Sequence, residues 1–197
     1  MGRYLREFAA EGCNITGTDA NPEIIRLTRE AGYHCLSPEE FTHTSETFDM
    51  IIMSHVIEHF APADLLHFMD SYLDRLKRGG HLIIATPLMS PYFHDDFDHV
   101  KPYHPIGIDM VFGPDAAQVQ YASRNKIKLK DIWFRRSPYR VNFHRARYVR
   151  MPLTRAVQTV DFVLALLYIA SFHAIGRTDG WVGVFEKLAP DAVRPPR

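Results

Sequence analysis

The sequence predicts a single α/β domain built on a mostly parallel sheet with helices on both faces. An apolar run at 50–53 is followed by an amphipathic stretch at 62–76, and after a Gly79-Gly80 turn a second apolar run occupies 82–85. Repeated strand–helix units of this kind need crossover connections, which are typical of parallel sheets. The length agrees, since 197 residues are ordinarily one domain with a sizeable core.

Local signals place the individual elements along the chain. Residues 3–10 have a helical pattern that stops before Gly12, and 14–18 form a short strand ending at Asp19. Asn21-Pro22 then caps and starts a helix that ends at Gly32. The further expected elements are a strand at 33–36, a turn at 37–40, a strand at 48–53, a helix at 62–76, a strand at 82–85, a long loop at 87–114, a helix at 114–125, a strand at 126–136, an apolar helix at 152–175 and a last strand at 180–188.

Composition is that of a soluble globular protein, with 46% apolar and 23% charged residues. The two cysteines, Cys13 and Cys35, form neither a C-x-x-C pair nor a metal-ligand spacing, so we expect reduced thiols. The first residues contain no apolar stretch typical of a secretion signal. The sequence therefore predicts a cytoplasmic protein.

Charge is unevenly distributed along a chain of zero net charge. Residues 1–100 hold 7 basic and 16 acidic residues, whereas 101–197 hold 16 and 7. Eleven basic residues and one acid lie within 124–155, and the apolar stretch FVLALLYIA follows at 162–170. This combination favours peripheral contact with an anionic membrane through 124–175, with a lid over the substrate or a dimer helix as alternatives. Binding of nucleic acid is less favoured.

Four stretches carry a family resemblance: GRYLREFAAEGCNITGTDANPE, FDMIIMSHVIEHF, LKRGGHLIIATP and GWVGVFEK. Their order and spacing resemble class I S-adenosylmethionine-dependent methyltransferases, in the subgroup with an H-x-x-E-H segment after the fourth strand. The resemblance implies a Rossmann-like sheet in one domain at 1–188, a helical insertion or lid at 137–177 before the last strand, and a disordered tail at 189–197. It also implies S-adenosylmethionine as the cofactor.

Cofactor-binding residues follow from the matched positions. By the resemblance, Asp19 ends the second strand and accepts hydrogen bonds from both ribose hydroxyls, a role that suits an acceptor-only carboxylate. Ala20 follows beside the ribose and adenine, and Ser54 and His55 lie beside the methionine moiety. Gly2 matches the last glycine of the glycine-rich turn.

The remainder of that turn and the first strand are missing from the sequence. In the family the first strand is central, and leaving its neighbours unpaired would cost about 1–3 kcal/mol per buried polar group. We therefore expect a shortened product or a misassigned start that binds the cofactor poorly. The alternative function is a degenerate, non-catalytic binding module with the methyltransferase fold.

Histidines provide the candidate catalytic groups. The H-x-x-E-H spacing of His55, Glu58 and His59 also occurs in inverted zinc peptidases, but here it follows a strand rather than lying inside one helix. A neutral His59 or His99 could remove a proton from an acceptor hydroxyl. In a third interpretation, Glu58 and His59 hold a divalent cation together with His99 or His104, so a metal site stays open. In a fourth, Glu58 and His59 are helix-start residues that orient the active-site loop.

The loop FHDDFDHVKPYHPIGI indicates the acceptor. It resembles a segment of methyltransferases associated with cell-surface polysaccharide and lipid-linked sugars, which implies that His99, Lys101 and Tyr103 face the acceptor. We expect methyl transfer to a hydroxyl or similar nucleophile of a small-molecule or lipid-linked, sugar-type acceptor.

Overall fold

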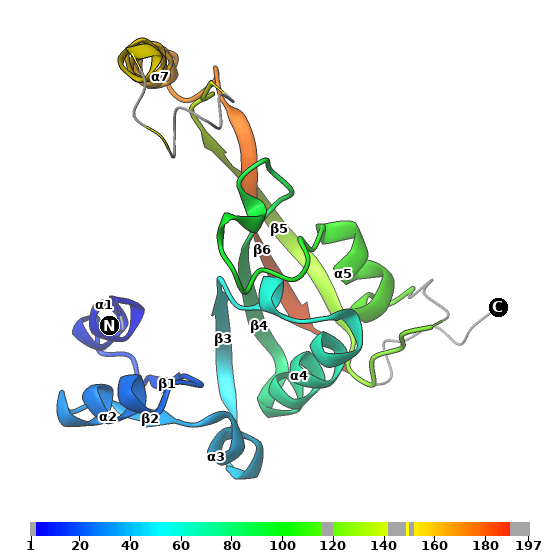
Figure 1. Cartoon of the computed structure of the whole chain (residues 1–197). Helices are drawn as coiled ribbons and strands as arrows, with labels where there is room; N and C mark the ends of the chain where they lie inside the picture. The colour runs from blue at the N-terminus through cyan, green and yellow to red at the C-terminus, as the bar shows by residue number, and fades with distance from the viewer. Residues whose placement is uncertain (1–2, 116–119, 142–148, 150–151, 190–197) are drawn as a thin grey trace. The chain divides into compact units, whose positions relative to one another are not determined.

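The computed structural model describes residues 3–115, 120–141, 149 and 152–189, which divide into two compact units, Met1–Thr47 and Phe48–Arg197 (Figure 1). Gly2 and the predicted tail from residue 190 onward lie outside the described residues. The fold is α/β with a mostly parallel sheet, as the sequence predicts.

The first unit contains a two-stranded parallel sheet and three helices. Strands β1 and β2 pair in register from Thr16↔His34 to Thr18↔Leu36. A capping box at Ser37 starts a helix where the sequence analysis expected only a turn. The elements of this unit are α1 (Arg3–Ala10), β1 (Thr16–Thr18), α2 (Pro22–Glu30), β2 (His34–Leu36) and α3 (Pro38–His43).

The second unit contains a four-stranded sheet in the order β3-β4-β6-β5. Strands β3 and β4 are parallel, and β6 runs antiparallel to both of its neighbours, so three of the four strands share one direction. The elements of this unit are β3 (Phe48–Ser54), the 3-10 helix η1 (Ile57–His59), α4 (Pro62–Arg75), β4 (Leu76–Pro87), the 3-10 helix η2 (Phe93–Asp95), α5 (Pro105–Phe112), β5 (Ile127–Ser137), α7 (Pro152–Ala170) and β6 (Arg177–Lys187).

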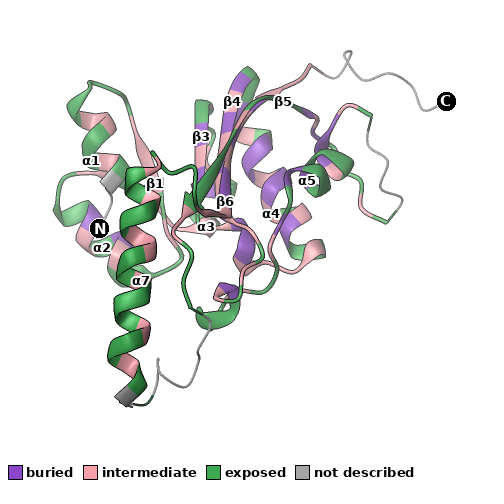
Figure 2. Cartoon of the chain, turned by 90° about the horizontal axis from the view of Figure 1, so that it is seen from above, coloured by how far each residue is buried: buried purple, intermediate pink, exposed green. Residues whose placement is uncertain are grey.

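The core of the second unit lies between one face of this sheet and helices α4 and α5 (Figures 1 and 2). Alternate residues of the strands point into it, as period-two patterning requires. Met69 and Leu73 of α4 are 0% exposed, so the helical stripe predicted from the sequence is the buried face of α4. The buried sheet side chains are Ile51, Met53, Leu76, Leu82, Ile84, Thr86, Ile127, Trp181 and Phe185.

Two loop predictions differ from the structure. The predicted loop at 87–114 contains helix α5, which starts because Pro105 occupies its first turn and the His104 ring accepts from the backbone N–H of Ile106. The predicted helix at 114–125 is absent from the described part of that range. There, the buried Asp70 carboxylate accepts from Ser123 Oγ at 2.5 Å and from Asn125 Nδ2 at 3.1 Å, which holds this segment as a loop.

The predicted Gly79-Gly80 turn is an irregularity inside β4. The register with β3 jumps from Phe48↔Leu76 to Met50↔His81, so several residues of β4 bulge out of the ladder. Gly79 has φ of 73°, which favours glycine.

Strands β5 and β6 form an antiparallel hairpin that carries α7 at its far end (Figure 1). The last hydrogen-bonded pair of the hairpin is Ser137↔Arg177, so everything between these two residues is an insertion at its end.

Candidate functional site

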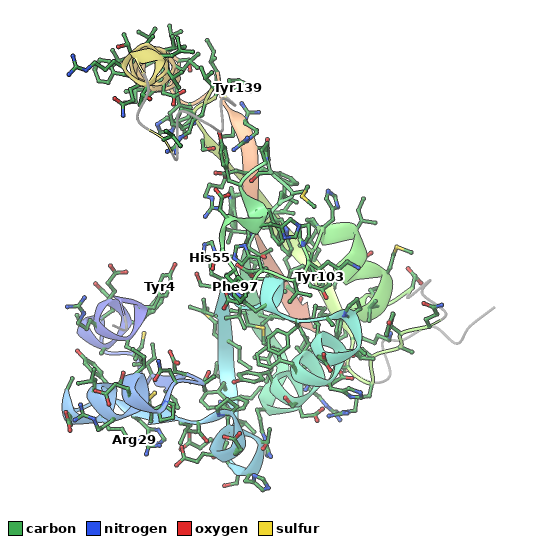
Figure 3. The ribbon with its side chains drawn as sticks, in the orientation of Figure 1. Tyr4, Arg29, His55, Phe97, Tyr103 and Tyr139 are labelled. Atoms are coloured by element: carbon green, nitrogen blue, oxygen red, sulfur yellow. The ribbon has the colours of Figure 1, made fainter. Side chains whose placement is uncertain are left out.

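The site lies at the carboxyl end of β3, beside the corresponding end of β4. Ser54 pairs with Ala85, and His55 then leaves the strand with φ of 55°, a left-handed conformation that non-glycine residues seldom adopt. The His55 N–H donates to the Ala85 carbonyl at 2.8 Å, which fixes this turn. Strained backbone is common at functional sites. Figure 3 shows His55 at this edge of the sheet.

Glu58 is a fully buried carboxylate, with a relative exposure of 0%. Its Oε1 accepts from His55 Nδ1 at 3.1 Å, and its Oε2 accepts from Thr86 Oγ1 at 2.9 Å. Burial raises the pKa of Glu58, but the hydrogen bonds from His55 and Thr86 outweigh burial, so the pKa lies below its usual value. The group is therefore an ionised carboxylate held inside the protein at neutral pH.

The His55 ring has a defined tautomer. Arg135 Nη1 approaches His55 Nε2 at 3.4 Å, and Arg135 Nε is held by Asp179 Oδ1 at 3.1 Å. Because a guanidinium only donates, Nε2 is the accepting nitrogen, and the ring proton lies on Nδ1, where it is donated to Glu58. The His55 ring is therefore oriented from both sides.

The loop after β4 brings a second histidine to this edge. The backbone N–H groups of Val100 and Lys101 donate to the Glu58 carbonyl at 2.9 and 3.1 Å, which fixes the loop next to η1. As a result, the His59 and His99 rings lie 5.0 Å apart between centroids.

Both of these histidines donate a ring proton to a backbone carbonyl. His99 Nδ1 lies 2.7 Å from the Phe93 carbonyl, and His59 Nδ1 lies 3.2 Å from the Asp98 carbonyl. In the neutral rings Nε2 is therefore the nitrogen with the lone pair. One ligand atom from each of Glu58, His59 and His99 lies within 4.8 Å of the others. We call these three residues the EHH cluster. It combines a buried negative charge with two basic nitrogens, so it can accept a proton or bind a divalent cation.

The residues predicted to bind the cofactor fall in both units. Asp19 and Ala20 follow β1 in the first unit, whereas Ser54 and His55 end β3 in the second. Asp19 Oδ1 accepts from the Asn21 N–H at 2.8 Å, and within the described residues Oδ2 has no donor. A carboxylate with one oxygen still available to accept hydrogen bonds suits a ligand that offers two neighbouring hydroxyl groups.

Tyr103 differs from its expected role. It is only 7% exposed, its hydroxyl donates to the Phe60 carbonyl at 2.9 Å, and its own carbonyl accepts from Trp181 Nε1 at 2.8 Å. Burial raises its pKa to about 12. Tyr103 therefore holds the loop against η1 and β6 rather than facing an acceptor. Lys101, in contrast, is exposed above the Tyr103 ring.

Sequence reasoning missed Thr86 and Arg135 as parts of the site. Thr86 ends the apolar run of β4, and its place opposite the β3 terminus was the available signal. Arg135 lies among many basic residues, and nothing in the sequence distinguishes it from them.

Comparisons with known proteins give a consistent result. A family model described as a methyltransferase domain matches residues 1–166. Ubiquinone biosynthesis O-methyltransferases of Chelativorans sp. and Mesorhizobium japonicum are 31% and 30% identical over 93 residues, which are 43% of this chain and 36% of each relative. The alignment thus spans little more than a third of these relatives.

Solved structures show the same fold. A SAM-dependent methyltransferase from Archaeoglobus fulgidus aligns with a TM-score of 0.58 at 18% identity, covering 94% of this chain and 81% of the other. The 1,6-didemethyltoxoflavin-N1-methyltransferase of Burkholderia thailandensis, solved with S-adenosylhomocysteine, aligns with a TM-score of 0.52 at 12% identity, covering 95% and 67%.

Proposed function

The chain belongs to the methyltransferase-domain family and is an S-adenosylmethionine-dependent methyltransferase, and from this premise we propose that it methylates a hydroxyl or similar nucleophile of a small-molecule or lipid-linked, sugar-type acceptor. The observation that carries the proposal is the EHH cluster at the carboxyl end of β3. Ligands bind at this edge in open α/β sheets. The O-methyltransferase names of the partial relatives support an oxygen nucleophile, and the loop around His99 supports the sugar-type acceptor.

The cofactor supplies an activated methyl group, and this chain's residues hold it. Asp19 would accept from the ribose hydroxyls through its second oxygen, and Ala20 would lie beside the ribose and adenine. Ser54 and His55 would flank the methionine moiety.

His59 and His99 are proposed to take the acceptor's proton. A neutral ring with its lone pair on Nε2 can accept a proton, and the nearby Glu58 carboxylate would stabilise the imidazolium that forms. Alignment of the hydroxyl with the methyl group contributes as well, because transfer requires an in-line approach.

A divalent cation at the EHH cluster is a second candidate. It is favoured by the ligand spacing and by the two carbonyl contacts that fix the ring tautomers, an arrangement common around metal-bound histidines. A cation there would lower the pKa of a bound hydroxyl and replace the histidines as the activating group.

The sheet topology supports the predicted first strand. Among the described residues, β1 pairs only with β2 and β3 pairs only with β4, so each strand has a free edge. We propose that a further strand can pair at the free edge of β3. Cofactor affinity is expected to rise when the chain is extended with the upstream codons, and equal affinity with and without the extension would contradict this.

An acceptor screen tests the function. The extended chain is incubated with methyl-labelled S-adenosylmethionine and with polyprenyl-linked sugars, free sugars or small phenols, and products are analysed by mass spectrometry. We expect an O-methylated sugar-type product, lost in His99→Asn and retained in His94→Asn, an exposed histidine of the same loop. Methylation of nitrogen or carbon, or cofactor binding without any product, would reject the proposal.

Calorimetry with Mg²⁺, Mn²⁺ and Zn²⁺ separates the two roles of the EHH cluster. A cation site predicts binding heat that His99→Asn removes and His94→Asn keeps, together with activity that a chelator abolishes. A proton-accepting role predicts activity that resists the chelator.

A further inference from the structure

Helix α7 has an exposed surface that nothing in the described structure covers. None of its described side chains is buried, and Figure 2 shows exposed residues along its length. By length and composition, Leu153–Ala170 is the one candidate membrane span found among the described residues. Apolar exposure on this scale indicates an interaction surface.

The half-buried side of α7 faces its own hairpin. Asp161 Oδ1 accepts from the Val141 N–H at 2.7 Å, and the Tyr168 hydroxyl donates to the Arg136 carbonyl at 2.6 Å. These contacts orient the helix. The half-buried positions recur every three or four residues, at Thr154, Val157, Asp161, Leu164, Ala165 and Tyr168.

A second, exposed side of α7 is apolar over about its last two and a half turns. Phe162, Leu166 and Ile169 follow one another at helical spacing and are 64%, 49% and 63% exposed. No charged residue occurs between Phe162 and Ala170. This side, here called the apolar face, continues to Phe172 after the helix, which is 93% exposed.

The hairpin excludes a membrane-crossing arrangement of α7. Both ends of the insertion start from a single strand pair, Ser137↔Arg177. The 19-residue helix is about 28 Å long. If it crossed a bilayer, residues 138–151 would have to cross back, taking four arginines through the hydrocarbon core. A helix lying in the plane of the surface requires no such return.

The charge of the residues next to α7 indicates which kind of surface the helix contacts. Residues 124–155 contain eleven basic residues and one acid. The exposed aromatic residues Trp133 and Phe134 belong to β5, and the exposed Tyr139 follows this strand (Figure 3). Basic residues attract anionic headgroups, and aromatic rings favour the membrane interface. A second copy of the chain is a poorer occupant, because a two-fold contact through α7 would bring two basic segments together.

We propose that α7 docks the protein flat on the surface of an anionic phospholipid membrane, with the apolar face buried at the boundary between headgroups and acyl chains. The proposal does not depend on the acceptor or on methyl transfer.

Vesicle co-sedimentation tests it. The protein is mixed with phosphatidylcholine vesicles with or without phosphatidylglycerol, at low and high salt. We expect binding to the phosphatidylglycerol vesicles, weakened by salt. The triple variant Phe162→Gln, Leu166→Gln, Ile169→Gln should weaken partitioning about tenfold or more, since it removes three large apolar side chains from the contact.

The matched control is Ile106→Gln with Met110→Gln, which removes exposed apolar residues from α5 instead (65% and 40% exposed). It should bind vesicles as the unaltered protein does. Equal thermal unfolding of all variants shows that folding is intact. Absent binding, equal binding by the triple variant, or a triple variant that only dissociates a dimer would overturn the proposal.

A label at Leu166→Cys, in a Cys13→Ser background, tests the orientation, because Cys13 is exposed whereas Cys35 is buried. An environment-sensitive dye should shift to the blue on anionic vesicles and remain fully quenchable by an impermeant reagent added outside. A protected fraction of the dye would mean that the helix crosses the bilayer, against the proposal.

Discussion

Replacing Glu58 by glutamine removes the one charge buried in the site while keeping the side-chain shape. The carboxylate accepts two hydrogen bonds, from His55 and Thr86, and is fully shielded from water. A hydrogen bond to a charged group contributes roughly 1 kcal/mol more than a neutral one. The relief of desolvation when the charge is removed offsets part of this. We expect Glu58→Gln to lower the free energy of unfolding at neutral pH by about 1–2 kcal/mol.

The loss should depend on pH in a defined direction. The pKa of Glu58 is lower in the folded protein than its reference value of 4.5. Its ionised form therefore contributes stability that is fully present above that value and disappears as pH falls through the folded pKa. The difference between Glu58→Gln and the unaltered protein should accordingly be largest near neutrality and shrink below pH 4.5. Urea unfolding, followed by far-ultraviolet circular dichroism at several pH values, measures it.

Activity should respond more strongly than stability. Without the buried anion, His55 loses the charged acceptor on Nδ1, and an imidazolium at His59 or His99 loses its buried counter-charge, leaving only the exposed Asp98 and Asp96 beside the two rings. We expect kcat to fall at least about tenfold to a hundredfold, the range found when partners that orient catalytic or metal-bound groups are removed. Glu46→Gln, an exposed carboxylate, is the control and should leave both measurements unchanged. Unchanged unfolding and unchanged kcat in Glu58→Gln would refute the reasoning.

Three further changes test other parts of the structure. Asp19→Asn should weaken S-adenosylmethionine binding by about tenfold to a hundredfold in calorimetry on the extended chain, because a donating amide replaces an acceptor; equal affinity would reject its ribose role. Tyr103→Phe should destabilise by about 1 kcal/mol at neutral pH through the lost hydroxyl bond. Burial raises the pKa of Tyr103 to about 12, so its hydroxyl stays protonated in the folded protein above pH 10, where the unfolded chain ionises. The stability that this difference contributes is lost as pH rises above 10, and the free energy of unfolding of Tyr103→Phe should therefore fall less steeply with pH in that range. Asp70→Ala removes the buried carboxylate that accepts from both Ser123 and Asn125, which keep only their bonds to each other, to Asp74 and to the backbone, and should cost roughly 2–4 kcal/mol in urea unfolding; no change would show that the loop is held otherwise.

Hydrophobic periodicity predicted the strands and helices that bury one apolar face along their length. The apolar run of β3 and the stripe of α4 appear in the structure as predicted, because burial on one face leaves a repeating pattern. Helix α5 was missed because its start depends on a His104 cap in a segment rich in turn-forming residues. The loop at 120–125 was missed for a different reason: Asp70, more than 50 residues earlier, supplies its hydrogen bonds.

The candidate site likewise combines residues that local motifs predict with residues that depend on contacts distant in the sequence. His59 and His99 were predicted from local motifs, and the structure brings their rings together. Thr86 and Arg135 act through contacts with residues distant in the sequence, Glu58 and His55, which no single-sequence pattern encodes. The tautomers of His59 and His99 could not be predicted from the sequence either, because they depend on which backbone carbonyl each ring nitrogen contacts in the folded chain.

Two adjacent residues of strand β5 contact the site and the proposed docking surface. Arg135 contacts His55 and the Asp179 carboxylate, whereas the next residue, Arg136, accepts from Tyr168 of α7 and donates to the Ala174 carbonyl. Successive residues of a strand point to opposite sides, so one short stretch can hold the site and the helix at once. Docking through α7 would therefore fix the orientation of this edge of the sheet relative to the membrane. A lipid-linked acceptor is the substrate class for which such an orientation is useful, because its reactive group stays near the surface on which the enzyme lies.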